Sequence, residues 1–125
     1  EHIEITQPNH KAIELFEKDV NGSYEKGEFE DIESIIQGIV GYKGRVHVAF
    51  GDVIQSGCDS PDELASTIDE QIHRHYKLFP INLLASGDES VEEGVKQRLA
   101  DKLQALPEGA QRHLIASYAN PVKNQ

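Results

Sequence analysis

The sequence predicts a predominantly helical α+β domain with about five helices and a small amount of sheet. Apolar residues recur at helical spacing in several long stretches of the chain. The range 45–50 instead alternates between apolar and polar residues, as a strand does, and a shorter alternation lies at 2–6. No internal repeat, low-complexity tract or linker divides residues 1–125, so we expect a single domain.

The chain begins with a strand end followed by a helix. Pro8 closes the alternating stretch 2–6. The range 9–20 then has helical periodicity, and Gly22 can supply the left-handed residue that ends a helix. The apolar positions of this first helix are Ala12, Ile13, Phe16 and Val20.

The middle of the sequence predicts a second helix and the clearest strand. The helix is expected from about Phe29 to Ile39 with one broad apolar stripe, and Gly41 and Gly44 follow it. The range 45–50 is the strand, and we expect one of its faces to be buried. The two faces would carry Val46, Val48 and Phe50 on one side and Arg45, His47 and Ala49 on the other.

Two capping boxes predict the next helix starts. Ser60-Pro61-Asp62-Glu63 begins a helix that runs to about Tyr76, and Ser90-Val91-Glu92-Glu93 begins another that ends before Pro107. Between them, the apolar range 78–84 is broken by Pro80 and is expected to cross the core as a connector. A short final helix carries Leu114, Ile115 and Tyr118 and should stop at Asn120-Pro121.

Composition excludes several classes of function. Asp and Glu number 22 against 12 Lys and Arg, a formal charge of -10, which repels phosphate backbones and argues against nucleic acid as a partner. No stretch approaches the ~20 apolar residues of a membrane span. A single cysteine, Cys58, cannot form an internal disulfide and favours the cytoplasm. The chain has no Met and opens on Glu1, so we expect a piece of a longer protein.

His47 and Asp52 have the His-x4-Asp spacing that some acyltransferases use to pair a base with an orienting carboxylate. On a strand, a spacing of five sends the two side chains to opposite faces, whereas a His base needs its carboxylate within hydrogen-bond reach. We therefore expect His47 to lie on the polar face of a half-buried strand without a catalytic role.

Other candidate residues predict no catalytic, cofactor or metal site. Asp69 and His73 can share a helix face, but His75 points away from it, and a zinc site needs a further ligand. Cys58 precedes a helix start, where the dipole can lower the pKa of a thiol, but the sequence places no base beside it. We expect the helix residues to form a solvated face, and the run Glu28 to Asp31 to favour a helix dipole.

Several segments, taken in order along the chain, indicate a protein family more specifically than the composition does. They are Gly22-Ser23-Tyr24-Glu25-Lys26, the run from Gly41 to Gly51, Ile68-Asp69-Glu70-Gln71-Ile72, the run from Tyr76 to Asn82, and Tyr118-Ala119-Asn120-Pro121-Val122. Together they resemble the C-terminal region of bacterial glycerolipid acyltransferases of the acylglycerol phosphate type. The resemblance covers nearly the whole chain through motifs that are structural.

The resemblance implies a parent enzyme of phospholipid biosynthesis, which moves a fatty acyl group from a thioester to glycerol phosphate or a lysophospholipid. The family's catalytic His-x4-Asp motif and its phosphate-binding Glu-Gly-Thr-Arg type motif precede the matched segments, and His47 and Asp52 fall in a later strand. No catalytic residue is therefore carried over. The implied role is a non-catalytic region whose partner is the rest of the enzyme, with attachment to the inner membrane through that enzyme.

A region cut from its sheet would expose strand edges, which favour a homodimer. An alternative to this role is a self-standing helical protein-interaction module without enzymatic activity. A small metal-binding protein that uses His73 and His75 is a third hypothesis.

Overall fold

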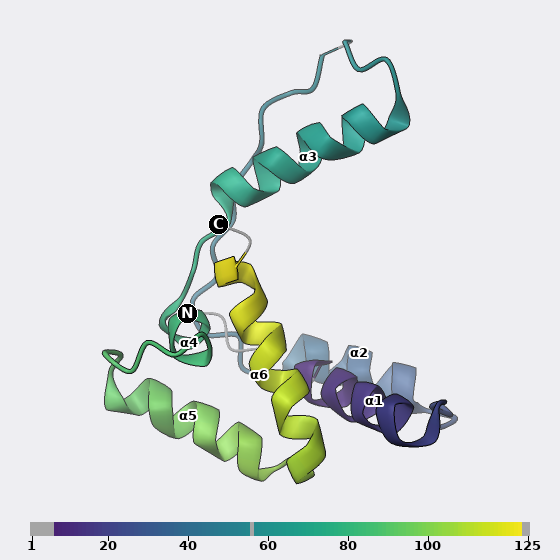
Figure 1. Cartoon of the computed structure of the whole chain (residues 1–125), viewed down its shortest axis with the longest axis vertical. Coiled ribbons are helices and arrows are strands. Elements are labelled where there is room, and N and C mark those ends of the chain that lie inside the picture. Colours follow the sequence, from purple (N-terminus) through teal and green to yellow (C-terminus); the bar gives the residue numbers. More distant parts are fainter. Residues whose placement is uncertain (1–6, 56, 124–125) are drawn as a thin grey trace.

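The computed structural model describes residues 7–55 and 57–123, which form six helices (Figure 1). In chain order these are α1 (Gln7–Asn21), α2 (Glu30–Val40), α3 (Pro61–His75), α4 (Pro80–Ala85), α5 (Glu93–Gln104) and α6 (Glu108–Lys123). The predicted helical class is confirmed. Five of the helices correspond to the expected ones, and α4 is the additional element.

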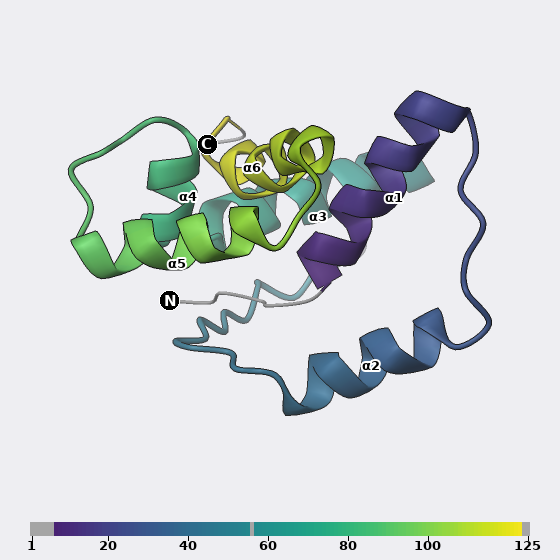
Figure 2. The same cartoon turned by 90° about the horizontal axis from the view of Figure 1, so that it is seen from below.

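The hydrophobic core lies among α1, α4, α5 and α6, with α6 at its centre (Figures 1 and 2). Helices α1 and α4 both pack along α6, and α5 packs against α4. The α2 helix lies beside α1 at the edge of this group, while α3 extends away from it. The buried core residues are Ala12, Ile81, Val95, Leu99, Leu106, Ala110, Leu114 and Tyr118.

Helices α1 and α6 approach each other closely at Gly109. A Cβ atom at this position would overlap the ring of Phe16, so the glycine makes room for an aromatic side chain of α1. Asp19 joins the same two helices, because its carboxylate lies 2.5 Å from Arg112 Nη2 and 2.9 Å from His113 Nε2. The contact therefore combines close apolar packing with an ionic link at the surface.

The range 78–84, expected as a connector, contains the short helix α4. Pro80 takes the first helical position, where its missing N–H costs nothing. Ile81 is 1% exposed, which confirms that this segment crosses the core. Asn82 is also buried: its Oδ1 accepts from Phe79 N at 2.9 Å and its Nδ2 donates to Tyr118 O at 2.9 Å. The amide thus links the start of α4 to α6.

The two predicted capping boxes have different outcomes. Ser60 caps α3 as expected, since its Oγ accepts from Glu63 N at 3.2 Å and the Glu63 carboxylate accepts from Asp59 N at 2.7 Å. At the second site, Ser90 instead turns back to Asp88, donating its N–H at 2.9 Å and its hydroxyl at 2.6 Å to the carboxylate. Helix α5 consequently begins later, at Glu93.

The expected stop at Asn120-Pro121 is wrong, because α6 continues to Lys123 with Pro121 inside its last turn. A proline this close to the end of a helix removes only one of the final hydrogen bonds. Burial of Leu114, Tyr118 and Ala119 along α6 outweighs that loss.

The strand expected at 45–50 is absent from the described residues. This range is extended but belongs to no sheet there, and the face expected to be buried is open to solvent. Val46, Val48 and Phe50 are 64%, 70% and 91% exposed. A strand needs a partner, and alternation along one segment cannot supply it. The second expected strand, at 2–6, lies outside the described residues.

Candidate functional site

Exposed apolar side chains are concentrated in α2 and residues 45–54, two consecutive parts of the chain that are here named the apolar arm. Nine of its aliphatic and aromatic side chains are more than half exposed: Ile32, Ile35, Ile36, Ile39, Val40, Val46, Val48, Phe50 and Val53. Single exposed apolar residues are ordinary, but such a concentration on neighbouring segments is typical of an interaction surface.

The α2 helix contributes a stripe with no cover. Its apolar residues follow the predicted helical spacing, yet no residue of α2 is buried, and Ile39 and Val40 are each 75% exposed. An amphipathic helix normally turns such a stripe towards a core. The sequence of α2 is therefore typical of a helix that packs against a core, but its apolar side chains are exposed.

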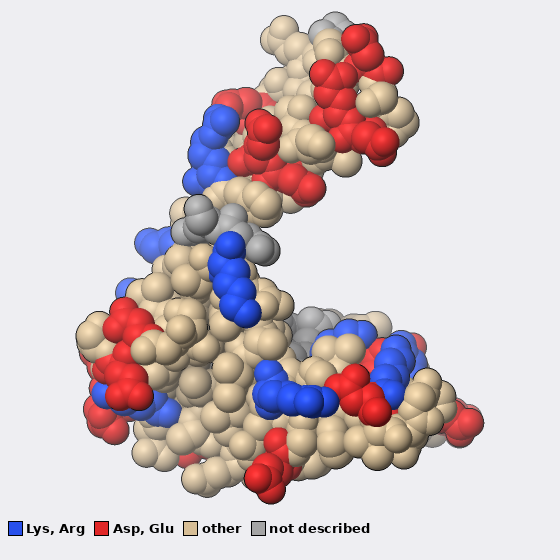
Figure 3. All heavy atoms as spheres, viewed as in Figure 1, with Lys and Arg blue, Asp and Glu red and all other residues tan. Residues whose placement is uncertain are grey.

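Helix α3 is polar over much of its surface and extends away from the core (Figure 1). Acidic side chains gather over it in the space-filling view (Figure 3). Asp62 and Glu63 occupy its first turn, and His73, Arg74 and His75 its last turn, so the charges complement the helix dipole.

His47 and Asp52 form no hydrogen bond with each other in the described part of the chain. Both are exposed, and Asp52 faces α3: its carboxylate is 3.9 Å from Arg74 Nη1, and its backbone carbonyl accepts from Gln71 Nε2 at 3.2 Å. The contacts of Asp52 thus hold the extended segment against α3. They do not orient an imidazole as a general base.

The residues weighed as metal ligands do not converge. Asp69, His73 and His75 lie on α3 as predicted, but the described residues contain no group of three or more His, Cys, Asp or Glu side chains placed to bind a metal ion. The hypothesis of a site built on His73 and His75 therefore has no geometric support within the described ranges.

Cys58 is a free, partly buried thiol whose Sγ lies 4.0 Å from Thr67 Oγ1. The Thr67 hydroxyl donates to the Glu63 carbonyl at 2.9 Å, so its proton is already used within α3. A nucleophilic thiol needs a base or a cation beside it. The contact with Thr67 instead places Cys58 as a packing residue at the start of α3.

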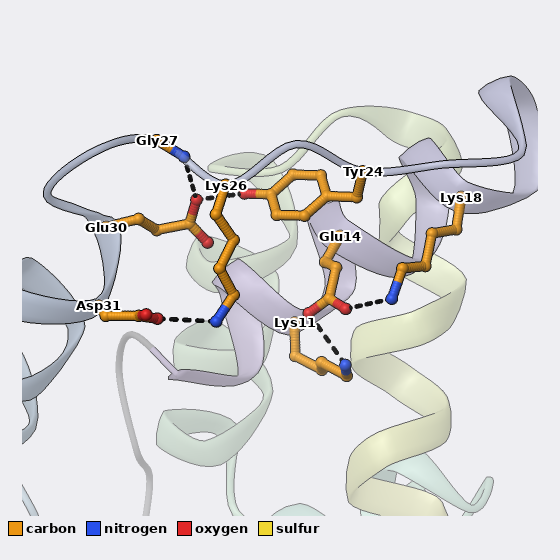
Figure 4. A network of polar contacts seen from close by, with 8 residues as sticks. All are labelled: Lys11, Glu14, Lys18, Tyr24, Lys26, Gly27, Glu30 and Asp31. Atoms are coloured by element: carbon orange, nitrogen blue, oxygen red, sulfur yellow. Dashed lines mark hydrogen bonds and ion pairs between the residues drawn. The ribbon is translucent and has the colours of Figure 1, made fainter.

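A polar network organises the connection between α1 and α2 (Figure 4). The Glu30 carboxylate accepts from Tyr24 Oη at 2.6 Å and from Gly27 N at 3.1 Å, while Lys26 pairs with Asp31 at 2.8 Å. The hydrogen bond to Glu30 raises the pKa of Tyr24 to about 12. Residues that the sequence placed simply in the first turn of α2 therefore also shape the preceding loop.

On α1, Glu14 lies between two lysines (Figure 4). Its oxygens are 2.9 Å from Lys11 Nζ and 2.6 Å from Lys18 Nζ, and these hydrogen bonds, led by the one from Lys18, lower the pKa of Glu14 to about 2. The group stabilises the exposed face of α1 and has no contact that indicates catalysis.

Comparison of the chain with protein-family models, curated proteins and solved structures finds no match. Across residues 7–55 and 57–123, no helix has the length and apolar content needed to cross a membrane. The apolar arm is consequently the strongest functional feature. The periodicity of the sequence identified the apolar residues of the apolar arm. It could not predict their exposure, because exposure depends on whether other parts of the chain pack against them.

Proposed function

We propose that this chain is a non-catalytic region of a glycerolipid acyltransferase, in which the apolar arm packs onto the α/β body that carries the catalytic residues. The exposure of the apolar arm is the observation that carries this proposal. The resemblance of the segments supports the identity of the parent enzyme, and the exposure of α2 and residues 45–54 supports the mode of attachment.

The size of the apolar arm fits a stable contact. Full burial of such a side chain contributes about 1.5–3 kcal/mol, so nine side chains more than half exposed leave on the order of 10 kcal/mol of apolar burial unrealised. At about 25 cal/mol/Å² this corresponds to roughly 400 Å². One side of a standard interface, ~800 Å² and slightly more than half apolar, offers a similar area.

The order of elements in the apolar arm suits an open sheet. Helix α2 leads through a short loop into the extended range 45–50, as a helix leads to the next strand in α/β proteins. The backbone of residues 46–50 could extend the edge of a sheet, and the stripe of α2 could cover a face of that sheet. Both exposed surfaces would then be buried in one step.

Activity assays test the proposal. Transfer from an acyl thioester to lysophosphatidate should be undetectable with the 125-residue chain and present in a longer product of the same gene that contains the catalytic motifs. In that longer protein, Asp52→Asn should leave the rate unchanged, whereas Phe50→Asp should reduce the amount of folded enzyme. Transfer by the short chain alone, abolished by His47→Ala, would overturn the assignment.

A second candidate is a self-standing helical interaction module without a parent enzyme. The core shared by α1, α4, α5 and α6 favours it, because this core is closed without any contribution from a sheet. Sedimentation and thermal melts separate the two candidates. A monomer that unfolds cooperatively and binds a partner protein supports the interaction module. A dimer paired through strand edges supports a region separated from its sheet.

A further inference from the structure

A cavity of about 650 Å³ lies where the extended segment, the C-terminal end of α3 and the C-terminal end of α6 meet. Its volume falls within the range of small-molecule sites. Val46, Ile72 and Phe79 contribute apolar surface, each from a different segment of the chain. The cavity shares Val46 with the apolar arm but is lined by no residue of α2.

The side chains of the cavity that can carry a charge near neutral pH are basic, although the chain is strongly acidic. His47, His75 and Lys77 line it, and no Asp or Glu is among its described lining residues. Within the described ranges these three side chains form no hydrogen bond or ion pair with another residue. Lys11 also reaches the cavity, but its ammonium group is bound to Glu14.

From this lining we infer that the cavity binds a single-chain amphiphile with an anionic head group, the head held by Lys77 with His47 and His75 and the alkyl chain packed on Val46, Ile72 and Phe79. A partnerless ammonium group can form a charge-assisted hydrogen bond with a carboxylate or phosphate. The helix ends nearby carry only about half a negative charge each, so they do not cancel the attraction at short range. This inference is independent of the acyltransferase assignment, because it concerns the chain by itself.

Calorimetric titration of the 125-residue chain with dodecanoate below its micellar concentration tests the site. We expect saturable binding of one molecule per chain. Dodecanol, which lacks the charge, and acetate, which lacks the chain, should each bind at least tenfold more weakly. Dodecyl phosphate in place of dodecanoate distinguishes the two head groups that Lys77 can hold, and tighter binding of either supports an anionic-amphiphile site.

Two variants test whether the amphiphile binds at this cavity. Lys77→Gln removes an exposed charge from the cavity and should weaken binding about tenfold, the effect of one charge-assisted hydrogen bond. Lys26→Gln removes the same charge far from the cavity, beside Asp31, and should leave the affinity unchanged. No binding of dodecanoate, equal binding of dodecyltrimethylammonium, or equal weakening in both variants would each overturn the inference.

Discussion

Substituting alanine for Ile39 and for Leu114 should separate the apolar arm from the core. Leu114 on α6 is fully buried, and truncating such a leucine removes its burial and leaves a cavity, which lowers the free energy of unfolding by about 2–5 kcal/mol. Ile39 on α2 is 75% exposed, so Ile39→Ala removes little packing, and the higher helix propensity of alanine offsets part of that loss. Its effect should stay within about 0.5 kcal/mol.

Urea unfolding followed by circular dichroism at 222 nm measures both variants on the 125-residue chain. Equal dependence on urea in the variants and the parent chain would show that the same surface is exposed on unfolding. Val95→Ala, also at a buried position, replaces Leu114→Ala as the core variant if the latter does not fold. A loss above about 1.5 kcal/mol for Ile39→Ala would mean that α2 is packed in the isolated chain, which would refute the apolar arm as an open surface.

Three further substitutions test the polar and backbone contacts. Glu14→Gln should lower the free energy of unfolding by only about 0.5–1 kcal/mol at pH 7, because the lysine partners of Glu14 are about half exposed. The pKa of Glu14 is lowered from 4.5 to about 2. The urea midpoints of the variant and the parent chain should therefore converge as the pH falls through that range. Glu30→Gln should bring the pKa of Tyr24 from about 12 towards 10.0 in an absorbance titration at alkaline pH; an unchanged titration would exclude the hydrogen bond as the cause. Gly109→Ala should lower the free energy of unfolding by about 1–3 kcal/mol, because the added methyl group overlaps the aromatic ring of α1. Gly94→Ala on α5, where the added methyl group meets only the end of a flexible arginine side chain at 3.6 Å, should cause no such loss, and thermal melts compare the two variants.

Local signals in the sequence predict most of the helices. Helix α1 ends where Gly22 adopts a positive φ of 76°, and Ser60 caps α3 through the residue that the capping box requires. Such signals depend only on neighbouring residues, so they hold regardless of how the rest of the chain packs. Ser90 shows the limit, because the nearer carboxylate of Asp88 takes its hydroxyl and delays the start of α5.

Tertiary contacts decide the elements that sequence reasoning missed. The short α4 has too few residues for a periodic pattern, and it is held by Ile81 in the core and by the amide of Asn82. Packing of α6 likewise overrides the stop expected at Pro121. Nothing in the local sequence indicates that His47, His75 and Lys77 come together at one cavity, since only the path of the chain brings them there.

The strand expected at 45–50 differs from these misses, because its pattern is clear and the structure leaves it unused. Val46, Val48 and Phe50 alternate as the inner face of a sheet would, yet all three are exposed, and the stripe of α2 just before them is exposed as well. The sequence patterns of both segments predict burial, but the side chains of both are exposed. This combination is most simply explained if the segments pack against another protein domain. Under the proposed function, the same residues are solvent-exposed in this chain and buried in the assembly, and the difference between sequence expectation and structure would mark the interface.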